Sequence, residues 1–322
     1  MKAYVYGANG AAISDVPKPS PTGTQILVKV HACGMNRADL GMIKGHVHGS
    51  AGGAGTVLGM EWAGEVVELG PDAKGWSVGD RVMGSGGGGY AEYAVTDHGR
   101  AFPIPAPMDY EQAASLTLAL TTMHNAVVTV GGLQPGQSLL VQGASSGVGL
   151  MAQQIAKLKG AKLVIGSSTD PKRRAQLTSH GADRAIDSND AGWVDQVLKA
   201  TDGAGVDVII DQVSGKLVNQ NLAATKVLGR IVNVGRLGGT HGDFDYDLHA
   251  ARRISYIGVT FRTRSIQEIR DIFTAVKQDI WPAVEAGKLA LPIDRVFPFD
   301  DIAQAVDYMS ANQHFGKIVL KL

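Results

Sequence analysis

The chain has 322 residues, enough for about two domains of roughly 100–200 residues each. Its 30 basic and 30 acidic side chains cancel, so we do not expect a nucleic-acid-binding protein, which would normally carry a basic excess. Cys33 is the only cysteine, which excludes both an intrachain disulfide and a zinc lobe held by several cysteines.

The first 115 or so residues predict short strands separated by turns. Apolar and polar residues alternate over residues 25–30, 64–69 and 90–95, as in half-buried strands. Glycine-rich stretches at 49–55 and 84–89 lie between them, and the 42 glycines of the chain are roughly twice the average share. We expect an irregular antiparallel β domain, in the form of a partly open barrel.

From about residue 115 to 260, strands and helices alternate. Apolar strands are predicted at residues 138–142, 162–165, 206–211, 230–234 and 254–259. Apolar residues also recur from Val148 to Ala156 at helical spacing. Such alternation is typical of a doubly wound parallel sheet in an α/β fold. The last section predicts a helix over 266–278, a strand at 295–297, a helix over 302–310 and a strand at 317–321.

The strongest local pattern follows the strand at 138–142. The run Gly143-Ala144-Ser145-Ser146-Gly147-Val148-Gly149 has the strand–turn–helix context of a dinucleotide fingerprint. Glycines permit the tight turn, and the unpaired N–H groups at the helix start attract a pyrophosphate. Ala144 and Ser146 depart from the strict G-x-G-x-x-G spacing, so a turn that binds no nucleotide is the alternative.

The end of the next strand favours NADPH over NADH. An NAD site usually has Asp or Glu there to bind the ribose 2′-hydroxyl, whereas this strand ends in Gly166-Ser167-Ser168-Thr169. Three cations follow, Lys172, Arg173 and Arg174, and small hydroxyls with cations suit a 2′-phosphate. The alternative is a solvated first turn of a helix, which Asp170 would cap.

Further stretches occur along the chain in a characteristic order. They are His31–Asp39 with an A-x-G-x-N-x-x-D element, Gly59–Val66 with Gly79–Val82, Leu120–Thr122, Gly181–Asp183, Asp207–Asp211 with Gly229–Val232, and Gly316–Leu320. Together they resemble the quinone oxidoreductase branch of the medium-chain dehydrogenases/reductases. The resemblance implies a GroES-like catalytic domain over 1–118, to which 262–322 returns, and a Rossmann NADP-binding domain over 119–261. It places the cofactor in a cleft between them.

The same resemblance indicates a site without zinc. Alcohol dehydrogenases of the superfamily have a ligand Cys where this chain has Asn36 and a ligand His where it has Met60. Neither an amide nor a thioether is a normal zinc ligand in such a site. His46 and His48 lie in a glycine-rich loop without a convincing third ligand, so we expect no metal.

The resemblance also assigns roles to individual residues. Asn36 is expected to contact the nicotinamide ribose, and Thr121 to lie near the nicotinamide. The remaining expected cofactor contacts are the Gly143–Gly149 loop for the pyrophosphate, Ser167, Ser168 and Arg173 for the 2′-phosphate, Val234, Gly235 and Arg236 along the nicotinamide half, and Lys317. As alternatives, Asn36 could bond its own loop, and Thr121 could cap a helix.

The sequence leaves open the roles of two carboxylates, Glu61 and Asp39, and the identity of the proton donor. Glu61 is expected to pair with Arg81 or with backbone donors, and Asp39 to cap a helix or anchor a loop. Some relatives have a Tyr near residues 45–49, where this chain has Gly45-His46-Val47-His48-Gly49. His48 or His46 could supply a proton instead, because imidazole titrates near neutral pH; water could do so equally.

The expected function is NADPH-dependent transfer of hydride to a small hydrophobic electrophile, either a quinone or an alkene conjugated to a carbonyl. The alternatives are a zinc-free ketone or alcohol oxidoreductase and a non-catalytic NADPH-binding member of the family. The N-terminal residues do not resemble a signal peptide, and no stretch reaches about 18 consecutive apolar residues. We expect a cytoplasmic protein with no membrane span, dimerising through the strand at 254–259.

Overall fold

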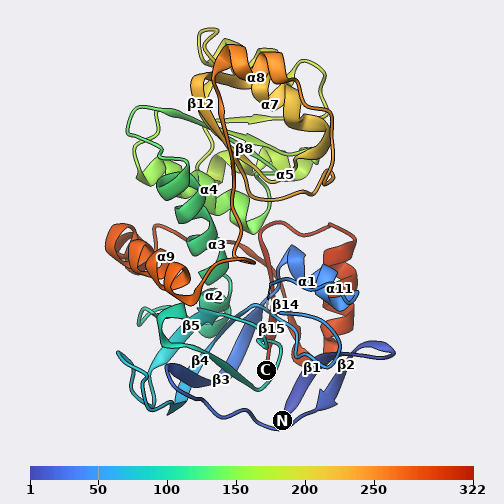
Figure 1. The fold of residues 1–322 in the computed structure, drawn as a ribbon, viewed down its shortest axis with the longest axis vertical. Helices are drawn as coiled ribbons and strands as arrows, with labels where there is room; N and C mark the ends of the chain where they lie inside the picture. The colour runs from blue at the N-terminus through green and yellow to red at the C-terminus, as the bar shows by residue number, and fades with distance from the viewer. Residues whose placement is uncertain (50) are drawn as a thin grey trace. The chain divides into compact units, whose positions relative to one another are not determined.

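The chain folds into two compact units. The computed structural model describes residues 1–49 and 51–322; residue 50, in the glycine-rich stretch 49–55, lies outside the described residues. One unit contains Met1–Thr121 and Phe261–Leu322, and the other contains Thr122–Thr260. We call them the catalytic unit and the nucleotide unit, after the domains that the sequence predicts. Figure 1 follows the chain through both.

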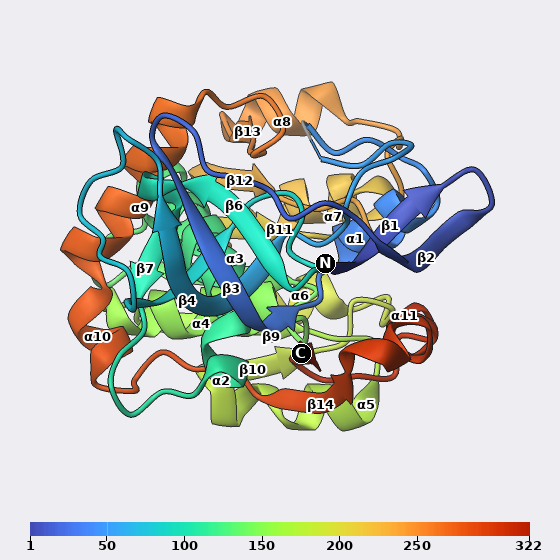
Figure 2. The ribbon, with the colours of Figure 1, turned by 90° about the horizontal axis from the view of Figure 1, so that it is seen from below.

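The catalytic unit is built on a seven-stranded sheet in the order β14-β15-β3-β4-β5-β7, with β6 also paired to β3. All of its strand pairs are antiparallel except β14 with β15. Figure 2 views this sheet. Its strands are β3 (Gln25–Gly34), β4 (Glu61–Leu69), β5 (Arg81–Ser85), β6 (Tyr93–Asp97), β7 (Ala101–Pro103), β14 (Ile293–Pro298) and β15 (Lys317–Lys321), and a separate hairpin joins β1 (Lys2–Gly7) to β2 (Gly10–Asp15).

Short helices surround this sheet. Among them, α9 begins with a capping box in which Ser265 and Glu268 satisfy each other's backbone N–H groups, and its apolar residues from Ile269 to Val276 are buried. The helices are α1 (Arg37–Ile43), α2 (Tyr110–Ala114), α3 (Thr117–Met123, which runs on into the nucleotide unit), α9 (Ile266–Asp279), α10 (Trp281–Glu285) and α11 (Ile302–Ser310), with 3-10 turns η1 (His98–Arg100) and η5 (Phe299–Asp301).

Several strand boundaries differ from the sequence prediction, and two of the differences have a clear cause in the pairing. β3 continues past residue 30 as far as Gly34, because Ala32 and Cys33 pair with both β4 and β15. The strand predicted at 90–95 begins only at Tyr93. Tyr90 instead exchanges backbone hydrogen bonds with Tyr4 and Leu58, and its ring is fully buried.

The nucleotide unit contains a six-stranded, wholly parallel sheet in the order β10-β9-β8-β11-β12-β13. Numbered within the unit, this is the order 3-2-1-4-5-6 of a doubly wound fold, and the order reverses between β8 and β11. The predicted parallel sheet is therefore confirmed. Its strands are β8 (Ser138–Gln142), β9 (Leu163–Ser167), β10 (Arg184–Ile186), β11 (Val206–Asp211), β12 (Thr225–Asn233) and β13 (Ser255–Gly258).

Helices cover both faces of this sheet. α4 packs against β8 and β9, whereas α7 and α8 pack against β12, and Figure 1 shows them on opposite sides. The fully buried Trp193 lies in the core between α6 and the sheet. The helices are α4 (Gly147–Leu158), α5 (Pro171–Ala175), α6 (Trp193–Ala200), α7 (Val218–Ala224) and α8 (Tyr246–Arg252), with the π-helical η2 (His124–Val130) and the 3-10 turns η3 (Leu177–His180) and η4 (Gly215–Leu217).

One stretch has the length and composition of a membrane-spanning helix. It is Tyr110–Val130, which comprises α2, α3 and η2 and has a mean hydropathy of 1.3. However, 72% of its apolar window is buried inside the protein, as in the core helix of a globular fold.

Candidate functional site

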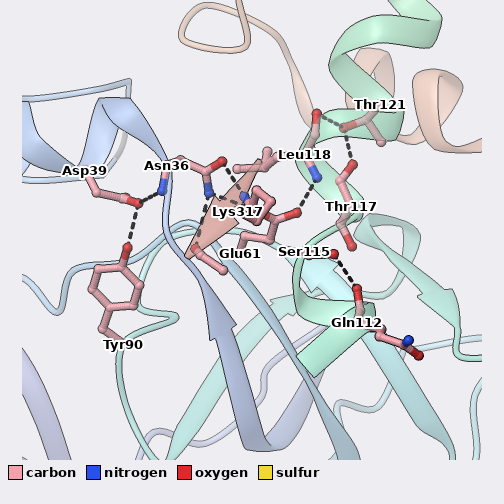
Figure 3. Close-up of polar contacts among 11 residues, drawn as sticks. Asn36, Asp39, Glu61, Tyr90, Gln112, Ser115, Thr117, Leu118, Thr121 and Lys317 are labelled. Carbon is pink, nitrogen blue, oxygen red and sulfur yellow. Dashed lines mark hydrogen bonds and ion pairs between the residues drawn. The ribbon is translucent and has the colours of Figure 1, made fainter. Parts of the chain in front are cut away.

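Three polar side chains of the catalytic unit form a closed triangle, in which Glu61 and Lys317 are buried and Asn36 is half-buried (Figure 3). The Lys317 ammonium donates to Glu61 Oε2 at 2.6 Å and to Asn36 Oδ1 at 2.9 Å, and Asn36 Nδ2 donates to Glu61 Oε2 at 3.0 Å. The Glu61 side chain is fully buried and that of Lys317 is 5% exposed. These contacts fix the Asn36 amide, because its oxygen faces an ammonium and its nitrogen faces a carboxylate.

The register of the sheet brings the three residues together. Gly34, at the end of β3, lies opposite Glu61 of β4 and Val319 of β15. Asn36 follows two residues later, and Lys317 is the first residue of β15. A Cβ at Gly34 would lie only 2.1 Å from the Ala114 carbonyl oxygen and 2.8 Å from Glu61 Oε2. Glycine is therefore required at this position.

Glu61 does not pair with Arg81, which corrects one of the two expectations for this residue. Its second oxygen, Oε1, accepts a hydrogen bond from the Leu118 backbone N–H at 2.7 Å, as the other expectation allowed. Arg81 instead donates to the Met108 carbonyl at 2.6 Å and lies over the Tyr110 ring. Glu61 is thus the centre of the polar triangle and also ties β4 to α3.

Asp39 anchors the other side of Asn36. Its Oδ2 accepts the Asn36 backbone N–H at 2.7 Å and the Tyr90 hydroxyl at 2.6 Å. Burial raises the pKa of this carboxyl to about 6, although the hydrogen bonds from Tyr90 and Asn36 act in the opposite direction. These contacts of Asp39 are those expected of a residue that caps a helix and anchors a loop. The link to Tyr90 was not foreseen.

Thr121 and His48 differ in their burial and in their hydrogen-bond contacts. The fully buried Thr121 lies inside α3 and donates its hydroxyl to the Thr117 carbonyl, four residues earlier, at 2.8 Å, so it does not cap the helix. His48 is half-buried, and its backbone pairs with Ala51. Burial and the nearby Arg262 lower the pKa of His48 below its usual 6.5. Its imidazole is therefore neutral at pH 7 and a weak proton donor there.

In the nucleotide unit, the Gly143–Gly149 loop has the geometry of a pyrophosphate site. Gly143 has φ +72°, and a Cβ at Gly149 would lie 2.6 Å from the Gly143 carbonyl oxygen, so the start of α4 packs directly on the turn. Ser146 caps α4 by accepting the Gly149 N–H at 3.1 Å. The first turn of a 12-residue helix thus faces the loop with N–H groups that lack intrahelical acceptors. These residues fit a dinucleotide.

The residues expected at the 2′-phosphate separate into two groups. Ser167 is fully buried, donates its hydroxyl to Gln142 Oε1 at 2.6 Å and accepts the Gly143 N–H at 3.1 Å. It therefore supports the turn, and its hydroxyl is not directed at a phosphate. Ser168 contacts the Ser145 hydroxyl at 3.2 Å, and Arg173 lies 3.8 Å from Asp170. Of the three, Ser168 and Arg173 therefore remain the candidates for a 2′-phosphate contact.

Val234, Gly235 and Arg236 follow the carboxyl end of β12. The backbone N–H groups of Val234 and Gly235 both donate to the Asp211 carbonyl, at 2.8 and 3.1 Å, which holds this loop against the end of β11. The Arg236 side chain is exposed. All three lie at the edge of the sheet where doubly wound folds bind their ligands.

Sequence reasoning missed a polar network at the point where the strand order reverses. Gln212 accepts the Ser146 hydroxyl at 3.0 Å and so connects β11 to the cap of α4. Deeper in the unit, Gln142 donates to Asn221 at 2.9 Å, and Asn221 donates to Asp211 at 3.2 Å. The parallel pairing of β8 with β11 indicates this network, since it places Gln142 opposite Asp211.

The residues at the position of the zinc ligands do not fit a zinc ion. The Asn36 carbonyl oxygen is occupied by an ammonium, and Met60 offers only a thioether. Among residues 1–49 and 51–322, no group of three or more His, Cys, Asp or Glu side chains is arranged to hold a metal.

A separate depression of about 930 Å³ lies in the catalytic unit. Trp76, Trp281 and Lys277 are among its lining residues, and none of the predicted site residues is. The candidate site is therefore defined by the polar contacts described above.

Comparison with known families agrees with this architecture. Residues 22–106 match the alcohol dehydrogenase GroES-like domain, and residues 147–278 match the family described as zinc-binding dehydrogenase. Rat quinone oxidoreductase (Rattus norvegicus) is 30% identical over 312 residues, covering 96% of this chain and 92% of that protein. The chain therefore belongs to the medium-chain dehydrogenases/reductases, within the quinone oxidoreductase-like group.

Other relatives are parts of much larger proteins. A phenolphthiocerol/phthiocerol polyketide synthase of Mycobacterium tuberculosis is 29% identical over 96% of this chain, which spans only 14% of that protein. Among solved structures, the CurK enoyl reductase superposes with a TM-score of 0.87 at 26% identity, covering 99% of both chains.

Proposed function

We propose that this protein is an NADPH-dependent oxidoreductase that transfers hydride to a quinone or an activated alkene without zinc. The observation that carries the proposal is the Asn36–Glu61–Lys317 triangle. An amide held between a carboxylate and an ammonium occupies the position at which zinc enzymes have a metal ligand. Without a Lewis acid to stabilise an alkoxide, an acceptor that is already electrophilic is the suitable substrate.

The two units would contribute different parts of this chemistry. The Gly143–Gly149 loop would bind the pyrophosphate through the helix start, and Ser168 and Arg173 the 2′-phosphate. Asn36 would orient the nicotinamide ribose, with Thr121 near the ring and Lys317 close to the cofactor. Bound NADPH supplies the hydride. Reduction of a quinone to a hydroquinone consumes that hydride and one proton: the hydride gives the hydroquinone monoanion, and the proton neutralises it.

A comparison of two acceptors tests the reaction class. We expect chelator-treated protein to oxidise NADPH with 1,4-benzoquinone and to turn over a matched open-chain enone more slowly. A quinone accepts hydride without a positioned acid, whereas the enone needs a proton at carbon, and His48 is neutral at pH 7. Absorbance at 340 nm measures both rates, with NADH as the cofactor control.

Each result of that comparison has a distinct meaning. Faster turnover of the enone would favour an enoyl reductase, the activity named for the CurK relative, and would direct attention to His46 and His48. Activity only after zinc is added would refute the zinc-free site. Tight NADPH binding with no turnover of a quinone, an enone or a ketone would indicate a non-catalytic family member.

Charge removal at Arg173 tests the choice of cofactor. In Arg173→Gln, the KM for NADPH is expected to rise roughly tenfold to a hundredfold, since a charge-assisted contact to phosphate is lost. The KM for NADH should stay within about twofold. Lys199→Gln, in the last turn of α6, is the control because it removes one exposed charge from the same unit. Equal changes for both cofactors in Arg173→Gln would contradict the assignment.

We further propose that the protein acts in the cytoplasm as a homodimer. β13 is the last strand of its sheet, and no strand among the described residues pairs with its outer edge. Tyr256 in this strand and Tyr246 nearby are partly exposed. An edge strand of this kind is suited to pairing with a second copy.

A further inference from the structure

One buried carboxyl, which caps α1 and anchors its loop, carries a charge that these structural contacts do not require. Asp39 is fully buried in α1, and only its Oδ2 is hydrogen-bonded, by Asn36 and Tyr90. Among the described residues, its Oδ1 has no hydrogen-bond partner. A half-satisfied carboxylate inside a protein costs stability, and an asparagine of the same shape would avoid the charge. Such a residue suggests a role in function.

The surroundings of Asp39 determine its charge state. Cys33 of β3, Glu61 of β4, Lys317 of β15 and Tyr90 all face it. Glu61 and Lys317 neutralise each other in an ion pair, so an ionised Asp39 leaves the cluster with one net negative charge. Because burial raises its pKa to about 6, Asp39 gains this charge as the pH rises through that value.

Only the ionised form accepts both donors at Oδ2 without burying an unpaired O–H. A proton on Oδ2 would displace Tyr90 or the Asn36 N–H, and a proton on Oδ1 would be a buried O–H with no acceptor described. The other side of Asn36 is already fixed, because Lys317 and Glu61 hold its amide. The backbone contact to Asp39 therefore completes the restraint on Asn36.

We propose that ionised Asp39, supported by Tyr90, is a positioning residue that holds Asn36 in its cofactor-binding orientation. This inference rests on the proposed function, since it assumes that Asn36 contacts NADPH. The ionised Asp39 lowers stability above pH 6, and in return it anchors the Asn36 backbone through the N–H contact. NADPH binding should consequently weaken as the pH falls through about 6.

The stability of Asp39→Asn separates this role from a structural one. An acid whose pKa is raised by folding stabilises the protein at low pH, and that stabilisation is lost as the pH rises through the folded-state pKa. At pH 8, Asp39→Asn should therefore be at least as resistant to urea as the wild type. Its dissociation constant for NADPH should nevertheless be about tenfold higher, and its pH dependence near 6 should shrink to the part that the titrating 2′-phosphate contributes.

Asp97→Asn is the matched control in the same unit. Burial raises the pKa of Asp97, but hydrogen bonds from Arg270, Thr24 and Gly99 outweigh this and bring the pKa to about 2. Removing its charge should therefore lower the urea midpoint at pH 8. NADPH affinity and its pH dependence should remain those of the wild type, because Asp97 lies outside the site. Asp39→Asn is thus expected to weaken NADPH binding without lowering stability, whereas Asp97→Asn is expected to lower stability without weakening NADPH binding.

Calorimetric titration with NADPH from pH 5 to 9 provides the binding readout without turnover. If Asp39→Asn binds NADPH as tightly as the wild type with the same pH profile, the positioning role is wrong. If it is less stable than the wild type at pH 8 and binds NADPH normally once folded, Asp39 is purely structural. A wild type that binds no NADPH would refute the proposed function itself, which is a different result from either.

Discussion

Replacing Lys317 by methionine is expected to lower the free energy of unfolding by about 3–5 kcal/mol, the usual cost of removing one partner from a buried ion pair. Glu61 would keep a fully buried carboxylate whose ammonium partner, at 2.6 Å, is gone. The Asn36 amide would also lose the donor that fixes its orientation. Urea unfolding followed by the far-ultraviolet circular dichroism signal measures this loss.

The double variant Glu61→Gln/Lys317→Met is the control for this prediction. It removes both charges, so most of the lost stability should return. The glutamine oxygen can also still accept the hydrogen bond from the Leu118 N–H. NADPH affinity should stay low in both variants. A single Lys317→Met variant as stable as the wild type would show that Glu61 and Lys317 are not coupled as the structure indicates.

Adding one methyl group at Gly149 is expected to abolish most NADPH binding. The new Cβ would lie 2.6 Å from the Gly143 carbonyl oxygen and 2.7 Å from Ala144 Cα. Both are backbone atoms of the tight turn, so α4 must move away from the loop that would bind the pyrophosphate. We expect the dissociation constant for NADPH to rise at least about tenfold to a hundredfold, and stability to fall by about 1–3 kcal/mol.

Gly258→Ala is the corresponding control in the same unit. Gly258 ends β13, and a Cβ built there meets no heavy atom within 4 Å. Its variant should keep wild-type NADPH affinity in calorimetric titration. Unchanged affinity in Gly149→Ala would remove the main structural argument for a dinucleotide at this loop.

The nucleotide unit could be predicted largely from sequence because its signals are local. Each apolar strand is followed by a helix or turn within a few residues, and the glycines of the Gly143–Gly149 loop mark the first crossover. The boundaries of β8 and β11 match the predicted ones. The error at Ser167 arises because a serine at a strand end has the same sequence signature whether its hydroxyl faces a ligand or the interior.

The catalytic unit was harder to predict because its contacts are distant in sequence. Neither the pairing of β15 with β3 nor the bond from Lys317 to Glu61, 256 residues apart, leaves a periodic pattern. Asn36 and Lys317 were each indicated by resemblance, but their contact was not. Tyr90 was assigned to a strand because alternation alone does not reveal a bend.

The position of β15 has a consequence for the order in which the protein folds. This strand lies between β14 and β3, yet during synthesis the whole of Thr122–Thr260 is made before it. The nucleotide unit is continuous in sequence and can fold early, whereas the catalytic sheet waits for β14 and β15, which complete one end of it. Until then the end of β3 at residues 32–34, beyond its pairing with β6, is an open edge on which other chains could pair, and Glu61 lacks its Lys317 counter-ion. Such long-range pairing is slow, so maturation of the catalytic unit should be the kinetic bottleneck.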